Sequence, residues 1–353
     1  ARCGRYRTKG AAHSKAGEHL MIAGEFSSLI RPVTALLLGA AILLMGNGLT
    51  VALLPLRADA EHFTQLEIGL LGSAFFAGLM AGCFIGPAIM ARVGHIRSFT
   101  AFTAIASLTP LLLAIFPTPH VWWLLRALTG VCFAGLFMVI ESWLNAAAST
   151  ETRGRVLAIY TIINLTVVSL GIQLIQLGDP RSYELFSLIA ILFSLAAVPV
   201  ALQTSAAPEP PRQAKLRITW LISISPAAVF GCFVAGLTNG AFWAYAPIYA
   251  TRSGLPVPEV GHFLALVVLG GAITQWPIGY LSDKMDRRTV LALVAALAAA
   301  CGVGLYLARF GPAGVIFLVG AGYGSMAYPL HAVCVAHAND LVHRKRAVEV
   351  SSG

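Results

Sequence analysis

The run of 25 residues from Pro32 to Leu56 contains no charged side chain. About 20 consecutive apolar residues cross the hydrocarbon core of a bilayer as a helix. Nine further runs of similar character follow, so the sequence predicts an all-α integral membrane protein with ten spans. Charged residues make up 11% of the chain, against about 25% in soluble domains, and there is no room for a soluble enzyme domain. The expected spans are 32–56, 67–90, 98–118, 120–145, 156–177, 183–202, 220–249, 259–281, 289–308 and 312–335.

Two stretches that lie 192 residues apart repeat each other without a gap. The shared residues include Asn, Pro and Glu, which are rare in a chain this apolar, so chance is a poor explanation. A parallel repeat of two apolar halves is typical of a transporter whose binding site lies between two bundles. The matched pairs are Asn47/Asn239, Gly48/Gly240, Ala52/Ala244, Pro55/Pro247, Ala58/Ala250, Glu67/Glu259, Gly69/Gly261 and Gly78/Gly270, with Arg92 opposite Lys284.

The net charge of +9 reflects membrane topology. Of the Lys and Arg residues, 19 lie in one set of alternate connections, the N-terminus included, and 4 lie in the other. The positive-inside rule therefore puts the N-terminus and the basic connections in the cytoplasm, and we expect a multi-pass protein of a bacterial inner membrane. Nothing in the sequence supplies the basic surface with interleaved aromatics that nucleic-acid binding would need, so no nucleic-acid partner is expected.

The segment 279–288, GYLSDKMDRR, resembles the signature loop of the major facilitator superfamily, which joins the second and third helices of each half. Asp286 stands where that family usually has Gly. The first-half copy at 87–97, PAIMARVGHIR, is degenerate, with Ala91 at the acidic position. The residues that match the family's loop are Gly279, Leu281, Asp283, Lys284, Arg287 and Arg288 in the second half, and Arg92, Gly94 and Arg97 in the first.

Further words of the sequence extend this resemblance over about 31–346. The segment 126–130, RALTG, resembles the family's fourth-helix pattern. Three other segments resemble the YcaD-like branch of the superfamily. They are ESWLNA at 141–146, TRGRVLAIY at 152–160 and QWPIGYLSD at 275–283.

The repeat and the resemblance together predict a major-facilitator-type fold of two bundles. We expect a disordered cytoplasmic tail over 1–30, a six-helix bundle over 31–202, a Pro-rich cytoplasmic linker over 203–218, and a second bundle over 219–353. Four helices of that second bundle are present. By symmetry two more are expected near 347–370 and 374–394, mostly beyond the end of the given sequence, so that the chain reads as C-terminally truncated.

Polar residues deep in the spans are candidates for the solute pathway. Asn47 and Asn239 are symmetry mates, each followed by Gly and, eight residues on, by a Pro that loosens the backbone hydrogen bonding. An amide facing lipid is costly, which favours a functional role for this pair and for Gln275. Arg126 is either a functional charge or a brace for neighbouring backbone carbonyls. The candidate pathway residues are Asn47, Asn239, Trp243, Gln275, Arg126 and Tyr328.

Two acidic residues are expected near the cytoplasmic face. An acid is favoured at a helix N-terminus, so Asp283 is predicted to face the start of the fifth helix, near 153–156, and to latch that face. The alternative is a basic turn that only sets topology. The resemblance implies that Glu141 forms a structural pair with Arg92 or Arg97, and proton carriage by Glu141 is the lesser alternative.

We therefore expect a secondary transporter of a small solute that works by alternating access, with a proton or another ion as a possible partner. It would be monomeric, surrounded by membrane lipid, and without cofactor or metal. The six cysteines form no CxxC pair and are interpreted as packing residues. The alternative is a transporter-like sensor or assembly factor that moves no solute. An intramembrane enzyme would need a cluster of catalytic side chains, and the sequence shows none.

Overall fold

The computed structural model describes residues 33–147, 153–203, 223 and 225–351, and these residues form helices and no strand. Ten helices are long and apolar enough to cross a membrane, which confirms all ten predicted spans. The predicted tail and nearly all of the predicted linker lie outside the described residues. The helices are α2 (Thr34–Ala60), α3 (Gln65–Val93), α4 (His95–Ile115), α5 (Pro119–Ala147), α6 (Arg153–Gln173), α7 (Glu184–Ala201), α9 (Pro226–Arg252), α10 (Val257–Lys284), α11 (Arg287–Ala308) and α12 (Ala313–Ser351), and the 3-10 helix η2 (Leu174–Leu177) extends α6.

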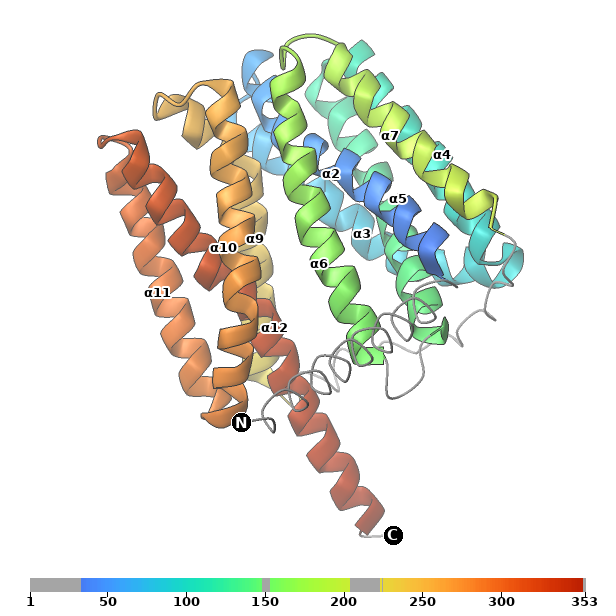
Figure 1. Ribbon diagram of the computed structural model, residues 1–353, viewed down its shortest axis with the longest axis vertical. Coiled ribbons are helices and arrows are strands. Elements are labelled where there is room, and N and C mark those ends of the chain that lie inside the picture. The colour runs from blue at the N-terminus through green and yellow to red at the C-terminus, as the bar shows by residue number, and fades with distance from the viewer. Residues whose placement is uncertain (1–32, 148–152, 204–222, 224, 352–353) are drawn as a thin grey trace, which may run out of the picture.

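The sequence repeat is a repeat of whole helices. A shift of 192 residues carries the bounds of α2 onto those of α9, and it carries the first residues of α3 and α4 onto those of α10 and α11. Pro55 and Pro247 lie inside the paired helices at equivalent positions, and both helices continue past them. Figure 1 shows the two halves side by side, α2 to α7 in blue to green and α9 to α12 in yellow to red, with α6 next to α10 between them.

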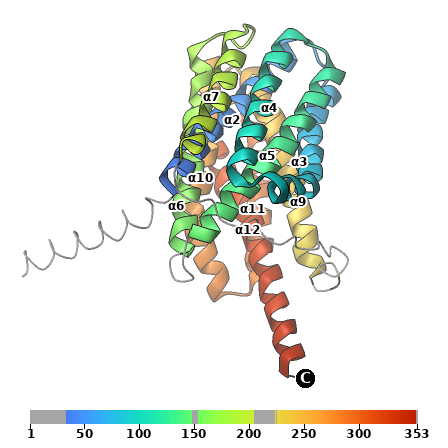
Figure 2. The same ribbon diagram turned by 90° about the vertical axis from the view of Figure 1, so that its right-hand side faces the viewer.

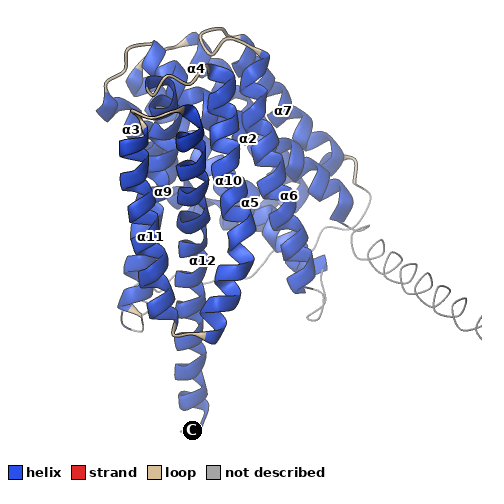
Figure 3. Ribbon diagram, turned by 60° about the vertical axis from the view of Figure 1, so that its left-hand side comes forward, coloured by secondary structure: helices blue, strands red, loops and turns tan. Residues whose placement is uncertain are grey.

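The helix bundle has two ends, which we call the distal face and the signature face. The distal face carries the turns 61–64 and 253–256, and the signature face carries the turns at Gly94 and at 285–286. α12 continues past the other helices at the signature face, as Figure 2 shows. In Figure 3 tan loops join the blue helices at both faces.

The start of α3 is a capping box formed by Thr64 and Glu67. The Thr64 amide donates to the Glu67 carboxylate at 2.7 Å, and the Glu67 amide donates to the Thr64 hydroxyl at 3.3 Å. The Trp123 indole of α5 donates to the backbone carbonyl of Glu67 at 3.1 Å. The Glu67 carboxylate thus caps the start of the helix, and its backbone carbonyl joins α3 to α5.

Glycines let α3 and α5 approach at van der Waals distance. A Cβ atom at Gly78 would collide with the backbone carbonyl of Ala127, and one at Gly130 would collide with the carbonyl of Phe75. Gly82 faces α5 as well, so Gly78 and Gly82 form a packing surface of small residues on α3. α10 and α12 meet in the same way, because Gly270 lies against α12 and Gly324 lies against α10.

The two halves differ in how well their first helices are covered. Leu43, Leu49 and Leu53 of α2 are fully buried, because α6 and α7 pack on this helix. α9, its symmetry mate, has no counterpart of α6 and α7 among the described residues, and Phe230, Phe233 and Leu237 are exposed on it. The two additional helices predicted from the symmetry concern mostly residues beyond 353 and stay a prediction, while 347–351, where the first was expected to begin, continue α12.

We predict that Gly78→Ala destabilises the protein, because the added methyl group forces α3 away from α5. Overpacking of this kind costs about 1–3 kcal/mol. The matched control is Gly236→Ala on α9, where a Cβ atom meets nothing within 4 Å. Thermal unfolding in detergent should show a lower midpoint for Gly78→Ala and an unchanged or higher midpoint for Gly236→Ala. Equal midpoints would contradict the close packing described here.

Candidate functional site

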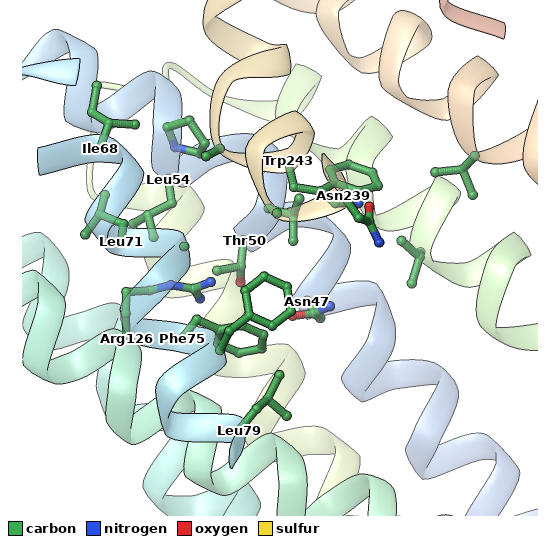
Figure 4. Close-up of a pocket in the computed structure, with 18 of the residues that line it drawn as sticks. Asn47, Thr50, Leu54, Ile68, Leu71, Phe75, Leu79, Arg126, Asn239 and Trp243 are labelled. Atoms are coloured by element: carbon green, nitrogen blue, oxygen red, sulfur yellow. The ribbon is translucent and has the colours of Figure 1, made fainter. Parts of the chain in front are cut away.

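A cavity of about 330 Å³ lies between the two halves, at the middle of the bundle. α2, α3, α5 and α6 line it from the first half, and α9, α10 and α12 line it from the second half. Figure 4 shows its side chains as sticks. Five of the six residues predicted for the solute pathway line it, namely Asn47, Asn239, Trp243, Arg126 and Tyr328.

The symmetric asparagines lie beside weakened stretches of backbone. Pro55 has no N–H, so the carbonyl of Val51 lacks its usual i+4 donor, and Pro247 has the same effect on the carbonyl of Trp243. Val51 and Trp243 both line the cavity. Each half therefore contributes one side-chain amide and one residue whose carbonyl lacks its helical donor.

Arg126 is the charged residue among those that line the cavity. Its side chain is 8% exposed, and its guanidinium carbon lies 4.3 Å from the centre of the Phe75 ring. The guanidinium makes no hydrogen bond or ion pair with a described residue, and its Nε–H is buried without a partner. The predicted alternative, a brace for neighbouring carbonyls, is therefore not what the structure shows.

The attraction between Arg126 and the Phe75 ring does not fully offset the free-energy cost of burying the guanidinium. Cation–π attraction contributes about 0.5–2 kcal/mol. An arginine at the centre of a membrane helix costs about 2.5–3.5 kcal/mol on insertion scales and more in other estimates. The site therefore retains a positive charge whose cost is only partly offset.

The second half supplies aromatic side chains with polar tips. The Trp243 indole and the Tyr328 hydroxyl lie close enough to interact electrostatically, and both residues line the cavity. Across the cavity in the first half, the Thr50 hydroxyl donates to the Gly46 carbonyl at 2.8 Å. Sequence reasoning missed Thr50 and Phe75, although Thr50 lies three residues after Asn47 and so shares its helix face.

Gln275 does not line the central cavity, which corrects the prediction for it. The residue lies two helical turns along α10 from Val268, the α10 residue that lines the cavity, and so about 10 Å nearer the signature face. It lines a separate hollow of about 220 Å³ between α10 and α12, together with Gly279, Asp283 and Arg287. Gln275 therefore lies outside the central cavity, and a place for it in the solute pathway stays a prediction.

The signature loop is an ion-pair network centred on Arg287. Its Nη2 lies 2.9 Å from the Asp283 carboxylate, and its Nε lies 2.7 Å from the carboxylate of Asp340 on α12. Asp286, the departure from the family pattern, caps α11 by accepting from the Thr289 amide at 3.1 Å. The network therefore ties α10, α11 and α12 together within one half.

The remaining loop residues have other surroundings. Lys284 lies over the ring of Tyr280 at 4.5 Å. The first-half loop turns at Gly94 with a φ of 80°, a conformation that favours glycine. His95, which follows Gly94, lies 3.0 Å from the Ser142 hydroxyl of α5. Three arginines of the two loops, Arg92, Arg97 and Arg288, are exposed.

The structure does not contain the predicted brace between Glu141 and Arg92 or Arg97. Among the described residues the four ion pairs involve other side chains. Glu141 is exposed on α5 and interacts electrostatically with Tyr160 of α6.

The latch predicted for Asp283 stays a prediction. The side chains of 153–155, at the start of α6, lie outside the described residues. The ion pair that Asp283 does form is with Arg287 of its own half.

Polar contacts hold the two halves together near the distal face. Arg252 Nη2 lies 2.7 Å from the Asp59 carboxylate. The Tyr245 hydroxyl donates to the carbonyl of Gln65, and the Gln173 side-chain amide donates to the carbonyl of Gly261 at 3.2 Å. Within the described part of the chain these three are the hydrogen bonds and ion pairs between the halves. In Figure 1, α6 and α10 diverge towards the signature face.

These features define a polytopic membrane protein built of two related helical halves around a central cavity. The family model described as Major Facilitator Superfamily matches residues 36–348. The chain belongs to this superfamily, which confirms the resemblance read from the signature loop.

The relatives come from the branch expected from the sequence. The chain is 26% identical over 302 residues to the uncharacterized MFS-type transporter YcaD of Escherichia fergusonii, covering 85% of this chain and 78% of that protein. To YcaD of Escherichia coli O139:H28 it is 25% identical over 327 residues, covering 92% of this chain and 84% of that protein.

Solved structures share the fold at low sequence identity. The nucleoside transporter NupG has a TM-score of 0.66 at 14% identity, with 85% of this chain and 80% of that chain covered. A D-xylose–proton symporter has a TM-score of 0.62 at 17% identity, with 86% and 82% covered. A bacterial homologue of the lysosomal transporter Spinster, inward-facing and unoccupied, has a TM-score of 0.68 at 15% identity, with 89% and 78% covered.

We predict that Asp283→Asn has little effect on stability, because Arg287 keeps its second carboxylate, Asp340. Partly exposed ion pairs contribute about 0–1 kcal/mol. If Asp283 is also a latch, its loss should increase maleimide labelling of a cysteine placed in the cavity, from the signature face. Asp340→Asn, which removes the other partner of Arg287, is the matched control. Equal labelling of both variants would leave Asp283 as part of an ordinary turn.

Proposed function

We propose that this protein is a secondary transporter that moves a small solute across a bacterial inner membrane by alternating access of the central cavity. The observation that carries the proposal is the cavity itself, which both halves line and which holds five of the predicted pathway residues. A site at the interface of two repeats is the arrangement that rocking of the repeats can open to either side. Membership of the superfamily supports the same function.

We also propose how the protein is oriented in the membrane and which conformational state the structure represents. The positive-inside bias puts the signature face in the cytoplasm. The polar contacts between the halves then close the side away from the cytoplasm, through Asp59 and Arg252 among others. On this proposal the structure corresponds to the cytoplasm-facing state. The outward-facing state would need the Asp59–Arg252 pair to separate, and an exposed pair is weak enough to do so.

The remaining parts of the proposal concern partners. The transporter works as a monomer surrounded by lipid, with a proton or another ion as a possible coupling partner. It performs no enzymatic reaction and needs no cofactor, metal or nucleic acid. The two bundles, 31–202 and 219–353, are the moving bodies, and 203–218 is the linker between them.

Alternating access can be tested without knowing the solute. A single cysteine at Val51, in a background with the native cysteines replaced by alanine, should react with an impermeant maleimide from both sides of the membrane. Labelling of Val51→Cys is first measured from each side in the unbridged protein. A second variant also carries Asp59→Cys and Arg252→Cys, which are joined by a short bifunctional thiol reagent. This bridge should abolish labelling of Val51→Cys from the distal face and preserve it from the signature face. Labelling from one side only, in the unbridged protein, would favour a sensor or assembly factor that moves no solute.

We predict that Asn47→Ala and Asn239→Ala each raise the half-saturation constant for solute flux while expression stays near normal. Losing one hydrogen bond to an uncharged group costs about 0.5–1.5 kcal/mol, which is roughly a threefold to tenfold loss of affinity. Gln275→Ala, which alters an amide outside the cavity, is the matched control and should leave the constant unchanged. Flux is measured in proteoliposomes. Reduced stability with unchanged affinity would instead mean that the asparagines only join helices within each bundle.

A further inference from the structure

The cavity carries a positive charge for which the described chain provides no counter-ion. Arg126 is more than nine-tenths buried, and its Nε–H has no partner. The residues that line the cavity include no aspartate or glutamate. Among the described residues the acids nearest the cavity in sequence are already engaged, since Glu67 caps α3 together with Thr64 and Asp59 pairs with Arg252.

Other uses of the guanidinium do not fit its surroundings. A structural arginine in a membrane helix pairs with an acid or with backbone carbonyls, and Arg126 does neither among the described residues. It lies at the cavity wall and points along the Phe75 ring, with Thr50 and Asn47 beyond it in Figure 4. The N–H groups of Arg126 are therefore available to a ligand that enters the cavity.

The other residues that line the cavity restrict the charge and the polarity of such a ligand. Phe75, Phe76 and Phe137 give the first-half side an aromatic surface. The polar groups besides Arg126 are neutral amides and hydroxyls and one indole, which donate or accept hydrogen bonds but add no charge. A single positive charge matches a single negative charge, because a dianion would leave one buried charge without a partner. The cavity volume leaves room for an apolar body beyond the charged group.

We propose that the solute is a small organic monoanion, a carboxylate on an apolar or aromatic body, whose carboxylate pairs with Arg126. Guanidinium and carboxylate form two parallel hydrogen bonds, which is the strongest geometry open to both groups. The apolar body lies against the phenylalanines. Asn239, Trp243 and Tyr328 reach the same solute from the second half, so that it bridges the two bundles. This inference rests on the proposed function, because it assigns the chemistry of the solute to that same cavity.

The test compares ligands that differ only in charge. The probes are benzoate, 4-phenylbutyrate, hexanoate and cyclohexanecarboxylate, each with its neutral amide and its amine, at pH 7 and equal ionic strength. Binding to the purified full chain is read from the rise in thermal unfolding temperature with ligand concentration. We expect at least one carboxylate to bind at least tenfold more tightly than its amide and its amine. If no carboxylate in the panel is preferred over its amide, the proposal is wrong.

Variants then locate the preference. Arg126→Gln should remove the tenfold preference, whereas Arg126→Lys should keep part of it, because the charge stays and the planar fork is lost. Asn47→Asp keeps Arg126 in place but adds a carboxylate to the same cavity wall, and it should also remove the preference. Arg288→Gln, at an exposed arginine outside the cavity, should not change it. A preference that survives in either Arg126→Gln or Asn47→Asp would overturn the proposal, so that one well-folded variant is enough for the test.

The outcome can be separated from that of the alternating-access experiment. Labelling from both sides without a charge preference would support the transporter proposal and contradict the proposal that the solute is an anion. A charge preference with labelling from one side only would leave an anion-binding membrane protein and reject transport.

Discussion

The close approach of α3 and α5 determines where the charged group of the cavity lies. Gly78 and Gly130 allow the two helices to touch through their backbones, and Phe75 of α3 is thereby held against Arg126 of α5. A bulkier residue at either glycine would separate the ring from the guanidinium. The packing of this one helix pair therefore sets both the stability of the first bundle and the electrostatics of the site.

The two halves repeat their helices but not their chemistry. The shift of 192 residues carries Arg126 onto Leu318, and it carries Trp243 and Tyr328 back onto Val51 and Leu136. The charge is therefore a property of the first half, and the large amphipathic rings are a property of the second. Among the side chains that line the cavity, only the asparagine pair is common to both. A cavity built from such halves can hold an asymmetric solute in one orientation, with its polar head towards α5.

Most of the fold follows from the sequence, because long apolar runs and an ungapped repeat leave few alternatives. All ten spans and the capping box at Thr64 were predictable from local pattern. The site was less predictable, because a span gives the depth of a residue roughly and its facing neighbour not at all. Gln275 and Glu141 show both limits: Gln275 lies outside the cavity, about two turns towards the signature face, and Glu141 takes part in none of the ion pairs among the described residues, where the resemblance implied one with Arg92 or Arg97. Arg126 was found from its charge, but its lack of a partner could only be seen in three dimensions.

The uncompensated charge of Arg126 has an electrical consequence. If the solute is a monoanion, the loaded cavity is neutral, while the empty cavity carries one positive charge. A charge that crosses the whole membrane field gains about 2.3 kcal/mol per 100 mV, and the rocking of Arg126 between the two sides covers some fraction of that field. The membrane potential, negative inside, therefore acts on the empty carrier and draws it towards the cytoplasm, while the loaded carrier moves without regard to voltage. Transport by such a carrier would be set by the voltage dependence of its return step.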